Sequence, residues 1–196
     1  MKLFLLTLNA IIFLSTGCAR SPERQYFTLT PDAASQKNSK VSFPTASIAM
    51  GPITIPDAVD RNKIVTRHQG SSRLEISDIN RWSQPLNAEI TTLLADDLRL
   101  KLSNTLVTTS GQNAGATQPD RRLDVDITRF EGTLGIGIWL EADWSVRDSK
   151  QSGQLHGHAL IHKATQSNDY EGLVKAYEEG LHDLAEHIRK TLKDSH

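Results

Sequence analysis

The sequence has almost no cysteine, no excess of charge of one sign, and no apolar run long enough to cross a membrane. Cys18 is the only cysteine among 196 residues, so no disulfide can form within the chain and the fold depends on its apolar core. The 22 basic and 23 acidic residues nearly balance, which gives no electrostatic footprint for nucleic acid. The main apolar run, residues 3–14, is about 12 residues long, whereas a membrane-spanning helix needs roughly 20.

The first 18 residues have the order of a bacterial secretory signal. Lys2 supplies a positive charge, residues 3–14 are almost wholly apolar, and small residues lead into Cys18. An unpaired cysteine in a secreted chain needs an explanation. Its position after Gly17 resembles the lipobox of bacterial lipoproteins, in which this cysteine is acylated, although Ser15 stands where that motif prefers leucine. The alternative is an ordinary signal peptide with a chance cysteine.

We therefore predict a signal peptide over residues 1–17, an acylated Cys18 with a polar tether over residues 18–44, and a single globular domain over residues 45–194. Several acyl chains hold a protein stably, since each buried methylene contributes roughly 0.8 kcal/mol. The residue after the acylated cysteine helps to set the destination of a lipoprotein, and Ala19 resembles the outer-membrane class. We expect an outer-membrane protein that faces the periplasm and carries no cofactor besides the covalent lipid.

Alternation of apolar and polar residues predicts a β-rich chain. In the tether, a short apolar patch predicts an edge strand, and a Gln-Gly turn predicts a hairpin between two of the next segments. Strict period-two alternation over the last three segments indicates a largely antiparallel sheet. The predicted strands cover residues 26–29, 46–55, 62–68, 71–76, 123–127, 136–146 and 155–161.

Two segments repeat apolar residues at helical spacing. The first begins with Ser83 as a cap and Pro85 in the first turn, and its apolar stripe covers residues 86–106. The second begins with Asn168 as a cap, and its stripe covers residues 170–192. One mixed, largely antiparallel sheet packed with two long amphipathic helices buries both stripes, so we predict an α/β fold of the α+β type.

No group of residues has the spacing of an enzyme active site, and we predict that the chain is not an enzyme. His156 and His158 share a strand face, but no third metal ligand at suitable spacing accompanies them, so a polar strand face is the better interpretation. Asp124 and Asp126 alternate with apolar residues, which favours solvated positions over paired catalytic carboxylates. The glycine-rich residues 132–137 lack the Gly-Lys-Ser/Thr of a phosphate loop and predict a hairpin turn.

Several short motifs resemble one known family. Four of them are Gly-Pro-Ile-Thr-Ile-Pro-Asp at 51–57, Asp-Arg at 60–61, Ile-Val-Thr-Arg at 64–67 and Arg-Trp-Ser-Gln-Pro-Leu at 81–86. Together with Tyr-Phe-Thr-Leu at 26–29 and Leu-Glu-Ala-Asp-Trp at 140–144, they resemble the PqiC/YmbA-like auxiliary lipoproteins of ABC-type transport systems. The resemblance implies a homo-oligomeric lipoprotein that works with an MCE-domain protein and its ABC transporter. It also implies a docking role at the outer membrane in a system that moves lipids between the two membranes.

Arginine and tryptophan are over-represented at interface hot spots, and the predicted partner-binding residues are therefore Arg61, Arg67, Arg81, Trp82 and Trp139. Each has a structural alternative. Trp82 would then hold the start of a helix in the core, and Arg61 or Arg67 would form salt bridges within the fold. Trp139 lies opposite the apolar face of its strand, so either a second layer covers it or it marks a contact surface.

Two other functions stay open. A lipid carrier would bind an acyl chain or a phospholipid in its own cavity, lined by Leu and Ile side chains of the core. An assembly lipoprotein of another envelope machine, such as one for secretion or cell-wall synthesis, would show that machine's phenotype without a permeability defect.

Overall fold

The computed structural model describes residues 22–31, 45–102, 104–109, 118–150 and 153–193. They form two helices and two sheets with both parallel and antiparallel strands, which confirms the mixed α+β class. The first sheet has the order β1-β4-β3, with bounds Gln25–Phe27, Leu74–Trp82 and Lys63–Arg67. The second has the order β5-β2-β6-β7-β8, with bounds Thr105–Thr109, Ala46–Met50, Arg121–Thr133, Gly137–Asp148 and Gln154–Ala164.

The prediction of one sheet was wrong, because β3 and β4 form a hairpin that pairs with β1 and not with the larger sheet. β1 runs parallel to β4, and β3 runs antiparallel to it. In the larger sheet β2 is parallel to both β5 and β6, whereas β6, β7 and β8 are antiparallel. Alternation reveals which face of a hairpin is buried, but it does not reveal whether the hairpin extends a sheet or packs against it.

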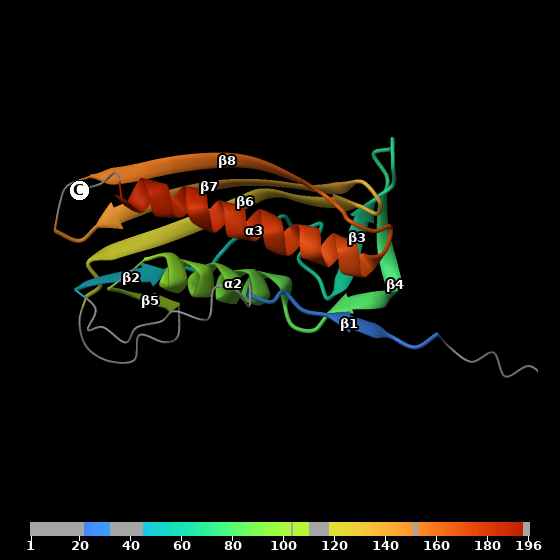
Figure 1. Ribbon diagram of the computed structural model, residues 1–196, viewed down its shortest axis with the longest axis horizontal. Coiled ribbons are helices and arrows are strands. Elements are labelled where there is room, and N and C mark those ends of the chain that lie inside the picture. The colour runs from blue at the N-terminus through green and yellow to red at the C-terminus, as the bar shows by residue number, and fades with distance from the viewer. Residues whose placement is uncertain (1–21, 32–44, 103, 110–117, 151–152, 194–196) are drawn as a thin grey trace, which may run out of the picture.

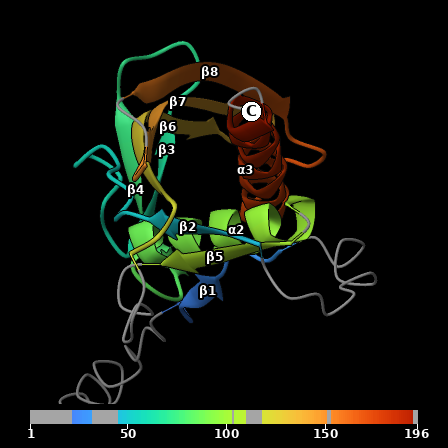
Figure 2. The ribbon, with the colours of Figure 1, turned by 90° about the vertical axis from the view of Figure 1, so that its left-hand side faces the viewer.

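The two helices are α2 (Leu86–Lys101) and α3 (Tyr170–Lys193). Figure 1 shows α3 running along β7 and β8, with α2 beside it and next to β5. Seen end-on in Figure 2, the larger sheet curves around the helices from β5 below to β8 at the top, and β1 of the smaller sheet lies below β5. A hydrogen bond between Asp97 and His182 joins the helices, and the Asp97 side chain is buried. The core lies between the helices and the inner faces of both sheets.

The first helix ends earlier than its apolar spacing predicts. α2 stops at Lys101, Leu102 is extended, and Asn104 has the left-handed φ of 60° that reverses the chain. Leu106, predicted as part of the helical stripe, lies in β5 and is 49% exposed. The prediction failed because Leu102 and Leu106 happen to continue the four-residue spacing of a helix.

Both helices begin with side-chain contacts that differ from the predicted caps. Pro85 is the N-cap of α2, and the Ser83 hydroxyl donates to Glu89 Oε1 over 2.8 Å, so it does not cap a backbone N–H. At α3 the capping carboxylate belongs to Asp169 and not to Asn168, because Asp169 Oδ1 accepts the N–H of Gly172 at 2.8 Å. Hydrogen bonds from the Ser167 hydroxyl and from that N–H lower the pKa of Asp169.

An aromatic cluster joins the two sheets through α3. The Phe130 ring stacks on Tyr177 with centroids 4.1 Å apart, and Trp82 meets the edge of Tyr177 at 6.3 Å. A Cβ atom on Gly132 would lie 2.7 Å from the Tyr177 hydroxyl oxygen, so glycine is needed for this close approach. The cluster fixes β6 against α3 immediately behind the surface described below.

Candidate partner-binding site

A β-bulge in β6 decides which side chains reach the outer face of the larger sheet. The register between β6 and β7 shifts between Ile127 and Arg129. Before the shift, odd-numbered residues such as Ile127 face the core; after it, the even-numbered Phe130 does. A bulge inserts one extra residue and re-aims those that follow. Arg129 and Glu131 therefore point outward, on the face that would otherwise hold Thr128 and Phe130.

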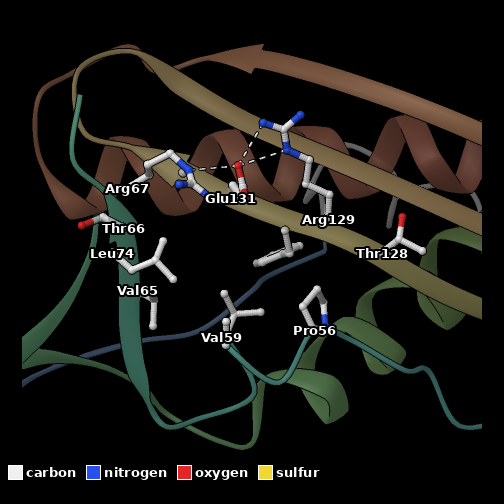
Figure 3. A pocket seen from close by; sticks show the side chains of 12 residues that line it. Pro56, Val59, Val65, Thr66, Arg67, Leu74, Thr128, Arg129 and Glu131 are labelled. Carbon is white, nitrogen blue, oxygen red and sulfur yellow. Dashed lines mark hydrogen bonds and ion pairs between the residues drawn. The ribbon is translucent and has the colours of Figure 1, made fainter. Parts of the chain in front are cut away.

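Glu131 is shared by two arginines from different sheets. Arg67 of β3 donates from Nη2 to Glu131 Oε1 at 2.5 Å and from Nε to Oε2 at 3.2 Å. Arg129 donates from Nε and Nη2 to Oε2 at 3.1 and 2.9 Å. Figure 3 shows both guanidinium groups converging on this carboxylate. Two cations around one anion leave a net positive charge, held in a fixed geometry.

These contacts set the charge state of the cluster. Partial burial alone would raise the pKa of Glu131, but the hydrogen bonds and charges of Arg67 and Arg129 outweigh it and leave that pKa lowered. The same hydrogen bond from Arg67 to Glu131 raises the pKa of the Arg67 guanidinium. Glu131 and Arg67 therefore both stay ionised at neutral pH.

Trp139 of β7 extends the cluster across the sheet. The Arg129 guanidinium carbon lies 5.2 Å from the centroid of the Trp139 ring, a cation–π distance. On its other side, Trp139 is 4.3 Å from the ring centroid of His162 in β8. Trp139 remains 39% exposed, which is unusual for so large an aromatic side chain. We name this surface the Arg–Trp strip; its members are Arg67, Glu131, Arg129, Trp139 and His162.

A small cavity of about 80 Å³ opens beside the strip, between β3, β6 and the turn that precedes β3. Its walls are mainly apolar, and the three charged side chains of the strip that line it are Arg67, Glu131 and Arg129. Figure 3 shows the apolar side chains below and the charged ones above. The apolar lining side chains include Pro56, Val59, Val65, Leu74 and Phe130.

The five predicted partner-binding residues do not form one group. Arg67 and Trp139 belong to the Arg–Trp strip. Trp82 is only 3% exposed and lies in the core, which agrees with the alternative that it holds the start of a helix there. Arg61 is exposed and approaches the carbonyl oxygen of Asp57 at 3.5 Å. Arg81 lies on β4 in the smaller sheet, and a partner role for any of the five stays a prediction.

Sequence reasoning missed Arg129 and Glu131. The sequence feature that could have identified them is a break in the alternation of β6. Its buried residues Ile127 and Phe130 are three positions apart, whereas strict alternation would place buried residues two apart. Cys18, the predicted lipid attachment site, lies outside the described residues. The glycine-rich residues 132–137 form the β6–β7 hairpin turn, as predicted.

His156 and His158 lie on the outer face of β8. His158 Nδ1 is 2.9 Å from Asp143 Oδ1, so its nearest partner is a single carboxylate. Within the described part of the chain, no group of three or more His, Cys, Asp or Glu side chains is placed to hold a metal ion. None of the helices described is both long and apolar enough to cross a bilayer.

The described residues thus form an α+β domain with an exposed, pre-arranged arginine–tryptophan surface. The chain belongs to the family of ABC-type transport auxiliary lipoprotein components, whose model matches residues 27–189. This confirms the resemblance carried by the sequence motifs. The family is described as an auxiliary component of ABC-type transport and as a lipoprotein, which implies a location at the cell envelope.

Solved structures share the fold. A crystal structure of an uncharacterized protein superposes with a TM-score of 0.71 at 17% identity, covering 87% of this chain and 99% of that one. A protein from Xanthomonas campestris, described by the family name DUF330, superposes with a TM-score of 0.63 at 15% identity. The match covers 88% of this chain and 100% of that one. No curated protein sequence matches the chain significantly.

Proposed function

We propose that the chain is a lipid-anchored, periplasm-facing auxiliary component of an MCE/ABC-type intermembrane lipid transport system. In this proposal it is acylated at Cys18, resides in the outer membrane and docks the MCE-domain protein of the transporter. Family membership supports a role beside an ABC-type transporter. The finer role rests on the surface of the domain.

The Arg–Trp strip is the observation that carries the docking role. Arg67 and Trp139, two of the residues predicted to bind a partner, converge on one surface through Glu131 and Arg129. Tryptophan and arginine dominate the energetics of interfaces. Because both guanidinium groups are already held by Glu131, binding orders few new side chains, which lowers its entropic cost.

The cavity beside the strip has the size of a side-chain pocket and not of a lipid-binding site. Sites that enclose a small molecule usually measure about 300–1,000 Å³. The cavity here is about 80 Å³, which suits the tip of one apolar side chain of a protein partner. A phospholipid acyl chain needs considerably more room, so the carrier function gains no support from this site.

Co-purification tests the proposal. The affinity-tagged full-length chain is recovered from detergent-solubilised membranes, and bound MCE protein is quantified by mass spectrometry. Trp139→Ala should reduce the recovery about 30-fold, which corresponds to the roughly 2 kcal/mol of a hot-spot residue.

Leu106→Ala is the matched control, because Leu106 is 49% exposed, comparable to Trp139, and lies in the edge strand β5, which β2 and β6 separate from β7. It should leave the recovery unchanged. Equal recovery with Trp139→Ala and the wild-type chain would contradict a docking role for the strip.

A further inference from the structure

The segment that follows the predicted lipid attachment site is fixed firmly to the domain. β1 pairs with β4 in parallel, with Phe27 opposite Trp82. Just after β1, the Leu29 N–H donates to the buried carboxylate of Glu89 at 2.7 Å. The next residue, Thr30, donates both its N–H and its hydroxyl to Glu178 Oε1, each at 2.7 Å. The place where the chain enters the domain is therefore defined.

The length of chain before β1 limits how far this end of the domain can lie from a bilayer. Gln25, the first residue of β1, is seven positions after Cys18. Seven extended residues span at most about 25 Å. β6 alone, with 13 residues, is about 43 Å long. An acylated Cys18, which is part of the proposed function, therefore keeps the β1 end close to the membrane and excludes an orientation with that end pointing away.

The outer face of the smaller sheet carries an aromatic and cationic row at this end. In register, Tyr26 of β1 lies beside Arg81 of β4, and Arg81 lies beside Lys63 of β3. Neighbouring residues of a sheet point to the same side, and successive residues alternate. Because Asn80 and Trp82 are buried in the core, Arg81 and its two neighbours lie on the other face of the sheet, where Tyr26 is exposed and Arg81 and Lys63 are half-buried.

The charges of this row are only partly compensated. No ion pair or side-chain hydrogen bond joins Arg81 to another described residue, and its buried Nε has no acceptor. Arg24, two positions before Tyr26, is exposed and likewise forms no ion pair with a described residue. Lys63 pairs with Asp78 at 3.0 Å. Tyr26 is 62% exposed, the most exposed of the large apolar or aromatic side chains described.

This combination fits a lipid surface. Tyrosine is enriched at membrane–water interfaces, where its ring lies at headgroup level and its hydroxyl remains hydrated. Arginine binds phosphate through a planar fork of donors. We propose that the row Tyr26, Arg81 and Lys63 contacts the phosphate headgroups of the bilayer that holds Cys18. The membrane thereby orients the domain, and the inference rests on the lipid anchor of the proposed function.

Depth-dependent quenching tests this orientation. The acylated full-length chain is reconstituted into vesicles of phosphatidylethanolamine and phosphatidylglycerol that contain a lipid with a nitroxide on its headgroup. A cysteine replaces Tyr26 and carries an environment-sensitive fluorophore. It is the only free thiol, because acylation occupies the sulfur of Cys18 and the chain has no other cysteine. The label at position 26 should be strongly quenched.

Leu160→Cys provides the matched control. Leu160 is 56% exposed, close to the value for Tyr26, and lies on β8, which Figures 1 and 2 place on the side opposite β1. A label there should not be quenched. In the Tyr26→Cys chain, Arg81→Gln should reduce the quenching severalfold, whereas Arg73→Gln, which removes an exposed arginine paired with Glu75, should not.

The outcomes separate this inference from the proposed function. If the chain floats with the vesicles but the label at position 26 is not quenched, the orientation alone is overturned. Equal quenching at positions 26 and 160 would also overturn the orientation alone. Unchanged quenching with Arg81→Gln would overturn the role given to that arginine. Failure of the chain to float with the vesicles would overturn the lipid anchor and the orientation together.

Discussion

Replacement of Glu89 by alanine should release the N-terminal strand from the domain at a measurable cost in stability. Glu89 is 5% exposed, although it is a carboxylate at the first turn of α2. It accepts three hydrogen bonds, from Leu29 N at 2.7 Å, Ser83 Oγ at 2.8 Å and Gln84 N at 2.9 Å. One side chain therefore joins the segment after β1, the end of β4 and the start of α2.

The expected magnitude follows from these contacts. A hydrogen bond to a charged group contributes about 1.5–3 kcal/mol, and a buried donor left unpaired costs about 1–3 kcal/mol. The three bonds share one carboxylate and do not add fully, so Glu89→Ala should cost about 3–5 kcal/mol. Glu89→Gln keeps one acceptor oxygen and should cost about half as much.

Urea unfolding followed by tryptophan fluorescence measures this change. With a slope of about 2 kcal/mol per molar, Glu89→Ala should lower the midpoint by about 2 M. Glu178→Ala is the control, because Glu178 holds the same segment through Thr30 at a more exposed position and should cost about 1 kcal/mol or less. Equal shifts for the two variants would refute the reasoning.

Three further predictions concern the Arg–Trp strip and the aromatic cluster behind it. Gly132→Ala should cost about 1–3 kcal/mol, because the new methyl group meets a tyrosine hydroxyl at 2.7 Å, whereas Gly153→Ala, with nothing within 4 Å, should be nearly neutral in thermal unfolding. Trp82→Ala should cost about 3–5 kcal/mol and Trp139→Ala about 1 kcal/mol or less in the same assay, since only the first is buried. The pKa of Glu131 is lowered in the folded chain, so ionised Glu131 stabilises the fold above the unfolded pKa near 4.3. This stabilisation is lost as the pH falls through that value and toward the folded pKa. Glu131→Gln should therefore flatten the acid limb of stability below about pH 5, and a limb as steep as that of the wild type would contradict this.

The long strands and both helices were predictable because each has a clear period. β6, β7 and β8 alternate strictly over most of their length, and α3 repeats apolar residues at helical spacing throughout. The short elements were predicted less well. β5 was missed because five residues carry almost no period and Leu106 matched the preceding helix. The division into two sheets depends on which strands pair across long sequence separations, which local patterning does not encode.

The candidate site was half predictable. Residue type selected Arg67, and residue type together with strand alternation selected Trp139; these two side chains do converge on one surface. Residue type also selected Trp82, which is buried in the core. Arg129 and Glu131 connect Arg67 to Trp139. Alternation could not identify them, because the bulge in β6 reverses which residues face outward. A bulge is visible in sequence only as a local failure of the pattern, and such a failure has several possible structural causes.

The docking role is tested most directly by photo-crosslinking in cells. A photoreactive aromatic amino acid, which keeps a ring at the position, replaces Trp139 in the Arg–Trp strip or, as a control of comparable exposure, Leu106 in β5. Mass spectrometry then identifies the adducts. The account predicts adducts with an MCE-domain protein from position 139 and none from position 106. The absence of such adducts at position 139, or equal yields from both positions, would contradict it.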